Sequence, residues 1–410
     1  MVFKNTSVQL VGRGVILFFG LVTTSLLTRS LGPDLYGDYI FLTAFWLFLV
    51  SFSDWGTPFI GIRELSQQKT LEKKRLVFTN LVCLRFYLLL ASLLLGLLAI
   101  ISLPLFSGLR RPAFICLGAV VLTSLQTNMM IVFQALLLFG WQTFIEALNS
   151  GLFLLLVVVN FAKGGSLTGA ILALIGARFL PVMFAWFKGK RLSVWPGKTD
   201  KKLQRFLWKE ALPTGGLLFL STAYDRLVDT SFLRHFWPSS TVGIYGLSYK
   251  FYGNLILPAY FLSRSLLPIL SQKRNSTRRS SAFRLGVSWS LLGAFLVVGA
   301  SWFFSPWIIK LLGGEAFSGS ILLLRVLIFS LPFTYLNHIF GFTLIASGKQ
   351  ILSFKIGLLS LVWNLLLNWW AIPRFSALGA AGVTVGTEVL VCLLSACFVY
   401  KSSFMADTPS

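Results

Sequence analysis

The chain has 410 residues, of which 56% are hydrophobic and only 12% are charged, and its mean hydropathy is +0.79. Its 36 Lys and Arg residues against 13 Asp and Glu residues give a net charge of +23, which in a water-soluble protein would suggest an acidic partner such as nucleic acid. A soluble core could not bury so much apolar surface, so the composition excludes that class and predicts an integral membrane protein.

Apolar windows of about 20 residues recur along the chain, and each is long enough to cross a hydrocarbon layer of roughly 30 Å as a helix. We expect an all-α integral membrane fold with about twelve transmembrane helices. In chain order they cover residues 8–29, 35–60, 78–105, 112–138, 141–163, 166–187, 211–233, 241–270, 285–311, 317–345, 352–373 and 376–400. The first window stays apolar up to Arg29 and has no small-residue cleavage pattern, so we expect it to remain in the mature protein.

Basic residues are unevenly distributed between the predicted loops. Loops 61–77, 188–210 and 271–284, together with Lys349 and Lys355, carry 20 Lys and Arg residues on one side of a twelve-span topology, against about seven on the other side. The positive-inside rule therefore predicts that both termini are cytoplasmic. We interpret most of the net charge as this topology signal, together with contacts to anionic lipid head groups, and expect no nucleic-acid partner.

The four cysteines offer no metal or disulfide chemistry. Cys83, Cys116, Cys392 and Cys397 all lie in apolar windows, and none of them forms a CxxC pair. The two histidines, His235 and His338, are too far apart to suggest catalysis. We therefore expect no cofactor.

Several short segments recur about half a chain length apart. LTRSLGPDLYGDY at residues 27–39 resembles LRHFWPSSTVGIY at 233–245, since both have Leu, then Arg, a central Pro and a final Gly-x-Tyr. Three further pairs follow in chain order, with shifts between 205 and 210: LSQQK at 65–69 and LSQK at 270–273, GWQ at 140–142 and GKQ at 348–350, GAILALIGAR at 169–178 and GAAGVTVGTE at 379–388. This order predicts a duplication.

Two duplicated halves of six spans each would have the same orientation and be related by a pseudo-twofold axis along the membrane normal, with a central cavity between them. The predicted organisation has four parts. They are an N-terminal six-helix lobe at 1–187, a basic cytoplasmic linker at 188–210, a C-terminal six-helix lobe at 211–400, and a cytoplasmic tail at 401–410.

Charged residues inside the spans are the first functional candidates, because a charge at membrane depth is costly unless it faces a partner or a water-filled cavity. Arg178, Lys250 and Glu388 lie well inside their spans, and Arg325 lies about two turns from the outer end. Arg178 and Glu388 occupy equivalent repeat positions with opposite charges. Our hypothesis is that they form a pair that breaks and re-forms during a transport cycle.

Other charged residues have simpler explanations beside the functional one. Arg85, Glu146, Asp54 and Arg264 lie nearer the cytoplasmic ends of their spans, where snorkelling or an interfacial partner can satisfy them. A second group of candidates, two aspartates and three tyrosines, lies in the middle of the chain.

Asp225 and Asp229 are one helical turn apart and share a face, which suggests either a cation-coupling or gating site or local neutralisation by Arg226 and Arg234. Tyr245, Tyr249 and Tyr252 also share a helix face, near Lys250. This stripe predicts either ordinary packing or a wall on which sugar rings or a polyprenyl chain can lie.

Motifs along almost the whole chain resemble one family. They are TRSLGPDLYGDY, the Asp54-Trp55-Gly56 end of the second span, AYDRLVD in the seventh, the VGIY start of the eighth with Pro268 at its exit, and the set Asn364, Asn368, Ile372-Pro373 and LGAAG at 378–382. Together they resemble Wzx-type polysaccharide and O-antigen flippases of the multidrug, oligosaccharidyl-lipid and polysaccharide exporter superfamily.

The resemblance implies a bacterial inner-membrane transporter, not an enzyme, that flips undecaprenyl-pyrophosphate-linked oligosaccharide repeat units to the periplasmic leaflet by alternating access. Its expected partners are that substrate, membrane lipids and polysaccharide polymerase machinery, with H⁺ or Na⁺ as candidate coupling ions. The cavity cations would be Arg178, Lys250, Arg325, Arg85 and Arg264; the gating or ion-coupling carboxylates Glu388, Asp225, Asp229, Glu146 and Asp54; and the sugar or lipid contacts Tyr245, Tyr249 and Tyr252.

Three alternatives remain at this point. A drug or cation antiporter of the same superfamily would want an acidic pocket, which Asp54, Asp225 and Asp229 could supply. A lipid II flippase is similar but usually carries two further spans. An integral-membrane glycan polymerase or ligase would need polar catalytic residues on a sizeable outer loop, whereas the outer loops here are short and poor in such residues.

Overall fold

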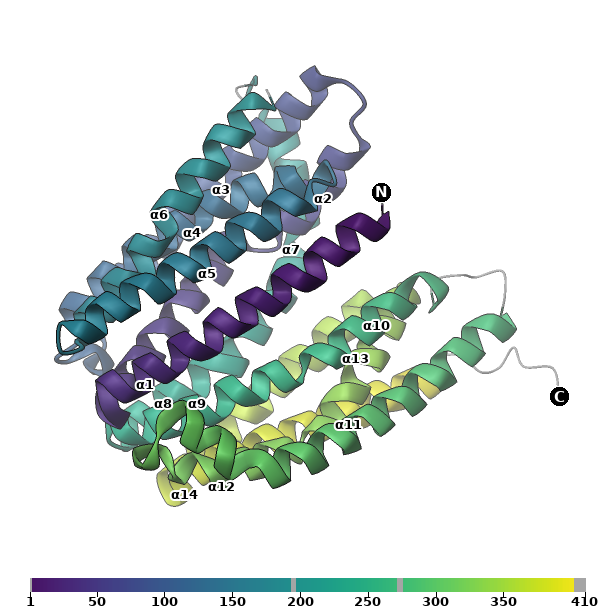
Figure 1. The fold of residues 1–410 in the computed structure, drawn as a ribbon. Coiled ribbons are helices and arrows are strands. Elements are labelled where there is room, and N and C mark those ends of the chain that lie inside the picture. Colours follow the sequence, from purple (N-terminus) through teal and green to yellow (C-terminus); the bar gives the residue numbers. More distant parts are fainter. Residues whose placement is uncertain (1, 193–196, 271–275, 402–410) are drawn as a thin grey trace. The chain divides into compact units, whose positions relative to one another are not determined.

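A computed structural model describes residues 2–192, 197–270 and 276–401, and this part of the chain is helical throughout, with no strand (Figure 1). Outside it lie residues 271–273 of the predicted repeat, parts of the basic loops 188–210 and 271–284, and residues 402–410 of the predicted tail. The chain divides into two compact units, Met1–Leu227 and Val228–Ser410, which we describe separately as unit 1 and unit 2. This division is one of packing; the lobes predicted at 1–187 and 211–400, with their linker and tail, stay a prediction.

Unit 1 contains seven α-helices among its described residues. They are α1 (Val2–Asp54), α2 (Thr57–Gln67), α3 (Leu71–Ser102), α4 (Arg110–Ala135), α5 (Phe139–Ala162), α6 (Leu167–Arg191) and α7 (Lys201–Thr222). Helices α1, α4, α5 and α6 pack side by side, and α7 packs against α1, α2 and α3 (Figure 1). A core that includes Phe78, Met129, Phe133 and Leu207 joins the ends of α2, α3, α4 and α7.

Unit 2 also contains seven α-helices in the described part. They are α8 (Asp229–Phe236), α9 (Ser239–Leu255), α10 (Leu257–Leu270), α11 (Ser276–Gly313), α12 (Gly319–Ile328), α13 (Leu331–Ala346) and α14 (Gln350–Lys401). Helix α13 packs against α10, α11 and α14, around a core that includes Phe283, Ile339 and Phe340. Helices α8, α9 and α12 pack on α14.

The described residues contain seven helices that are long and apolar enough to span a membrane, namely α1, α3, α4, α5, α6, α11 and α14, and the bent pair α12–α13 makes eight. The predicted integral membrane fold is therefore confirmed, whereas the predicted number of twelve is not. Part of the difference arises because α1 and α14 each run through a kink, at Gly32 and Ser376, and each covers two predicted windows. The other part lies in α7 to α10, which are shorter or carry more polar residues.

Both copies of the recurring segment, 27–39 and 233–245, form corners between two helical stretches. In α1, Gly32 has φ 66° and ψ 176°, and Pro33 opens the next helical leg. In unit 2, α8 ends at Phe236, and Trp237 and Pro238 connect it to α9. Proline suits both places because its fixed φ fits the start of a helix and its missing N–H is not needed there.

The turn between α1 and α2 is shaped by residues 54–56. Trp55 and Gly56 both have positive φ, 35° and 72°, so the helix is interrupted directly after Asp54. Helix α7 packs so closely on this turn that a Cβ on Gly215 would lie 2.4 Å from the Trp55 carbonyl oxygen. The turn positions the Asp54 side chain, and only glycine at 215 permits the contact.

Candidate functional site

Two buried polar clusters lie inside the helical units, one in each. The first, which we call the Arg85 cluster, joins α3 to α4 and to the α1–α2 turn through Arg85, Asp54, Thr57, Ser124 and Asn128. The Arg85 side chain is 0% exposed and forms an ion pair with Asp54, with 2.7 Å between Nη2 and Oδ1. Its Nε donates to the Asn128 side-chain oxygen at 2.5 Å, and its Nη1 donates to Thr57 Oγ1 at 2.9 Å.

The Arg85 guanidinium is thus fully paired. A buried charge is tolerated only when it is neutralised and hydrogen-bonded, and Asp54 supplies the neutralising charge while Ser124 accepts two longer contacts from Nη2. Sequence reasoning assigned Arg85 to the substrate cavity and Asp54 to gating. The structure brings the two together as one ion pair that ties the turn to α3, and the cavity and gating roles stay predictions.

The second cluster, the Asp229 cluster, joins α8, α9 and both legs of α14. Asp229 is 2% exposed. Its carboxylate accepts from the Tyr245 hydroxyl at 2.5 Å and from the Asn368 side-chain nitrogen at 2.8 Å, with the Thr384 hydroxyl at 3.4 Å. Asn368 also donates to the side-chain oxygen of Asn364, one helical turn earlier, at 2.9 Å.

The Asp229 cluster differs from the Arg85 cluster in its charge. In the described part of the chain, the partners of Asp229 are a phenol, an amide and an alcohol, all of them neutral. The side-chain nitrogen of Asn368 donates to Asp229 and to Asn364. Its side-chain oxygen is buried and has no hydrogen-bond donor among the described residues. A buried carboxylate beside an unsatisfied oxygen is an arrangement that a proton or a small cation would satisfy.

The predicted tyrosine stripe lies along α9 in one row. Ring centroids are 5.6 Å apart between Tyr245 and Tyr249, and 5.5 Å apart between Tyr249 and Tyr252. Tyr245 belongs to the Asp229 cluster, and Tyr252 is buried and accepts a hydrogen bond from Ser330 at 2.7 Å. Two of the three hydroxyls therefore form hydrogen bonds inside unit 2. A sugar-contacting role for the stripe stays a prediction.

Arg178 and Glu388 each have partners within their own unit. The Arg178 guanidinium carbon lies 4.4 Å from the ring centre of Trp46, and its Nη1 donates to the Leu174 carbonyl at 2.8 Å. Glu388 accepts from the side-chain nitrogen of Asn337 at 2.7 Å. The proposed opposition of the two charges across a pseudo-axis stays a prediction.

The remaining candidates are dispersed. Arg325 is half-buried, donates to Ser305 Oγ at 3.1 Å and lies 4.9 Å from the Trp302 ring centre. Lys250 and Arg264 are exposed, and Glu146 accepts from Gln142 at 2.9 Å. The side chain of Asp225 lies outside the part that the structure describes.

Sequence reasoning missed most neutral members of the two clusters, since it gave no role to Thr57, Asn128 or Thr384 and used Asn364 and Asn368 only as part of a motif. Tyr245 was a candidate, but for a sugar or lipid contact. One signal was available for Asn364 and Asn368. They lie at positions i and i+4 of an otherwise apolar span, and two amides on one face of a membrane helix indicate a polar contact.

Comparisons with known proteins agree with this architecture. A model of the family described as "Polysaccharide biosynthesis protein" matches residues 2–274, and the MatE family model matches residues 216–370. The chain is also similar to the capsular polysaccharide biosynthesis protein CapF of Staphylococcus aureus, at 29% identity over 192 residues. That match spans 45% of this chain and 46% of CapF, slightly under half of each.

Solved structures show the same fold. An inward-facing multidrug resistance MATE family transporter of the MOP superfamily is similar with a TM-score of 0.81 at 13% identity, over 96% of both chains. The lipid II flippase MurJ, in an inward closed conformation, is similar with a TM-score of 0.79 at 14% identity, over 97% of this chain and 89% of that one. The family model covers more than half of the chain, so this protein belongs to the Wzx-like polysaccharide biosynthesis family of the MOP/MATE superfamily, a family of membrane transporters and not of enzymes.

Proposed function

We propose that this protein flips undecaprenyl-pyrophosphate-linked oligosaccharide repeat units from the cytoplasmic to the periplasmic leaflet of a bacterial inner membrane. The observation that carries the proposal is the polysaccharide biosynthesis family match over residues 2–274. The likeness to CapF supports a role in polysaccharide assembly, and the fold shared with a lipid II flippase supports a lipid-linked substrate. The product would serve O-antigen or exopolysaccharide assembly, with polymerase machinery as the next partner.

The proposed transporter has twelve spans in two six-helix lobes and both termini in the cytoplasm. Counting each leg of α1 and α14 separately supports the higher number, because the non-helical residues Gly32 and Ser376 divide each of them between two predicted windows. Head group and sugars would cross between the lobes by alternating access, while the polyprenyl tail stays in lipid. No covalent step is needed.

We expect the pyrophosphate to bind cations that are not already paired with a carboxylate. Arg85 is fully buried against Asp54, so we give it a structural role. Arg178 and Arg325 are half-buried and rest on tryptophan rings. These two are the better candidates for binding the anionic head, because a guanidinium on an aromatic face keeps N–H donors for phosphate oxygens. Lys250 remains a candidate because it is exposed.

We assign cation coupling to the Asp229 cluster. Its buried carboxylate has neutral partners, and the unsatisfied Asn368 oxygen, with the Thr384 hydroxyl and Asn364 oxygen nearby in the same network, supplies the hard oxygen ligands that Na⁺ prefers. Protonation of Asp229 would also neutralise the buried carboxylate. Ion binding removes the cost of a buried charge between α8, α9 and α14, so occupancy can bias how these helices pack.

The first test is deletion of the gene in its source strain, with assays of surface polysaccharide and of lipid-linked repeat units. We expect loss of the surface polymer and accumulation of complete, unpolymerised repeat units on lipid at the cytoplasmic face. Wild-type levels of polymer in the deletion strain would contradict the proposal.

Drug or cation export is a second candidate function, because the MatE family model covers residues 216–370, which include Asp229, and the fold matches a multidrug transporter. The same deletion strain separates the two functions. Unchanged surface polymer with increased sensitivity to cationic drugs would favour export.

A further inference from the structure

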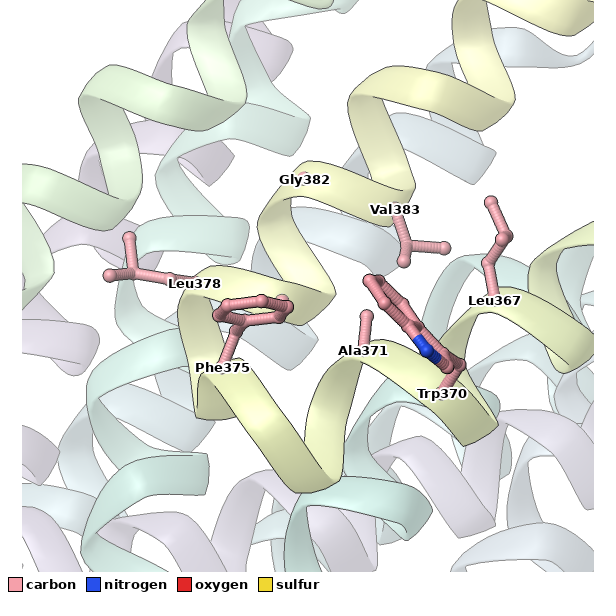
Figure 2. Close-up of a pocket in the computed structure, with 8 residues that line it drawn as sticks. Leu367, Trp370, Ala371, Phe375, Leu378, Gly382 and Val383 are labelled. Carbon is pink, nitrogen blue, oxygen red and sulfur yellow. The ribbon is translucent and has the colours of Figure 1, made fainter.

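An apolar crevice lies at the kink of α14. Ser376, with φ 55° and ψ −139°, separates a first leg that carries Leu367, Trp370 and Phe375 from a second leg that carries Leu378, Gly382 and Val383. The crevice between the legs has a volume of about 360 Å³. In Figure 2, Trp370 and Phe375 of the first leg lie opposite Gly382 and Val383 of the second.

Glycines create this hollow. A Cβ on Gly379 would lie 2.6 Å from the Ala371 carbonyl oxygen, so the two legs touch there. A Cβ on Gly382 would meet nothing within 4 Å, so the legs have parted one turn later. The lining is hydrocarbon and aromatic, and Trp370, Phe375 and Leu378 are about half exposed. A crevice of this composition at the edge of a membrane helix is suited to a hydrocarbon chain.

A positive charge lies beside the crevice. Arg374 is exposed, donates through Nη1 to the Trp370 carbonyl at 2.8 Å, and holds its guanidinium carbon 5.2 Å from the Trp370 ring centre. These neutral contacts position the guanidinium without neutralising it. Within the described residues, no carboxylate pairs with Arg374 or lines the crevice. The same end of α14 thus offers an apolar groove and one cation.

We propose that the crevice and Arg374 bind an anionic glycerophospholipid of the bilayer, with the phosphodiester on Arg374 and an acyl chain between the two legs of α14. One guanidinium balances the single negative charge of a phosphodiester. A pyrophosphate carries more charge than one arginine can balance, so this site suits a resident phospholipid better than a polyprenyl-pyrophosphate. The inference does not depend on the proposed transport function.

The test is native mass spectrometry of the purified full-length protein with phosphatidylglycerol added to the detergent. Gly382→Leu should fill the crevice and lower retention of phosphatidylglycerol by ~10-fold, because the leucine side chain displaces several methylenes of the acyl chain. Gly386→Leu is the matched control, since Gly386 lies one turn further along the same leg, has nothing within 4 Å of its Cβ and does not line the crevice. It should retain the lipid.

Arg374→Gln tests the head-group contact separately. The wild type should prefer phosphatidylglycerol over phosphatidylethanolamine, and the variant should lose that preference by ~5-fold, the typical contribution of one basic residue near a lipid surface. Equal retention by Gly382→Leu and Gly386→Leu would overturn the crevice as the site, and an unchanged preference in Arg374→Gln would overturn the head-group contact. Displacement of phosphatidylglycerol by equimolar undecaprenyl phosphate would overturn the assignment of the occupant.

Discussion

The Arg85 cluster of unit 1 and the Asp229 cluster of unit 2 each bury one charged side chain among amides and alcohols, yet they differ in counter-charge. Arg85 has Asp54 at 2.7 Å, whereas the partners of Asp229 within the described part of the chain are Tyr245, Asn368 and Thr384. A neutralised pair needs nothing further, while a lone buried carboxylate is stable only if something brings it a positive charge or a proton. This difference is the basis of our proposal that the first cluster has a structural role and that the second binds a proton or a cation.

The largest effect should come from Arg85→Met. Removing the guanidinium leaves Asp54, Thr57 and Asn128 without their partner, and breaking a buried ion pair typically costs about 3–5 kcal/mol. We expect a marked drop in the thermal midpoint of the purified protein. The double variant Arg85→Met with Asp54→Leu should recover part of the loss, since it leaves no unpaired charge. A midpoint equal to that of the wild type in Arg85→Met would remove the structural role.

Asp229→Asn should separate function from stability. The amide can still accept from Tyr245 and removes the lone buried charge, so the thermal midpoint should hold or rise. Transport should fall by about 10-fold to 100-fold, the usual range of coupling between sites, and its dependence on Na⁺ or pH should disappear.

Complementation of the deletion strain, scored as surface polymer, measures the effect of Asp229→Asn. Tyr245→Phe is the companion variant, because it keeps the carboxylate and removes one donor, and its effect should be smaller. Full complementation by Asp229→Asn would contradict the proposed role of Asp229 in cation coupling.

Gly215→Ala tests whether the turn that positions Asp54 depends on its contact with α7. The new Cβ would lie 2.4 Å from the Trp55 carbonyl oxygen, and such overpacking typically costs about 1–3 kcal/mol. Gly253→Ala in α9 is the matched control, with nothing within 4 Å of its Cβ, and should stabilise its helix by roughly 0.5–1 kcal/mol. If both variants shifted the thermal midpoint equally, the close contact between Gly215 and Trp55 would not explain the loss of stability.

The smallest effect should come from Glu210→Gln, which removes an ion pair at the surface. Arg63 and Glu210 are 2.8 Å apart, but their side chains are 43% and 41% exposed. Solvent screens such pairs, so the loss should stay below about 1 kcal/mol and shrink further at high salt. A destabilisation as large as that of Arg85→Met would mean that burial does not explain the difference between the ion pairs.

Part of the candidate site could be predicted from the sequence. Arg85, Asp54 and Asp229 stand out as charges in apolar windows, and general energetics makes any such residue a candidate. Their partners could not be predicted, because Asp54 and Arg85 are 31 positions apart and Asp229 and Thr384 are 155 positions apart. No helical period links residues at those distances.

The sequence by itself determined that this is a multi-span helical membrane protein, because hydrophobicity over about 20 residues is a local property that the bilayer reads directly. Its predicted windows also end and begin on either side of Pro33 and Pro238, where the helices break, since proline limits the backbone locally. Only the tertiary structure decided which buried charge is neutralised. That depends on which helices meet, as α3 meets the α1–α2 turn and α8 meets α14, and such contacts follow from the packing of whole helices rather than from any single segment.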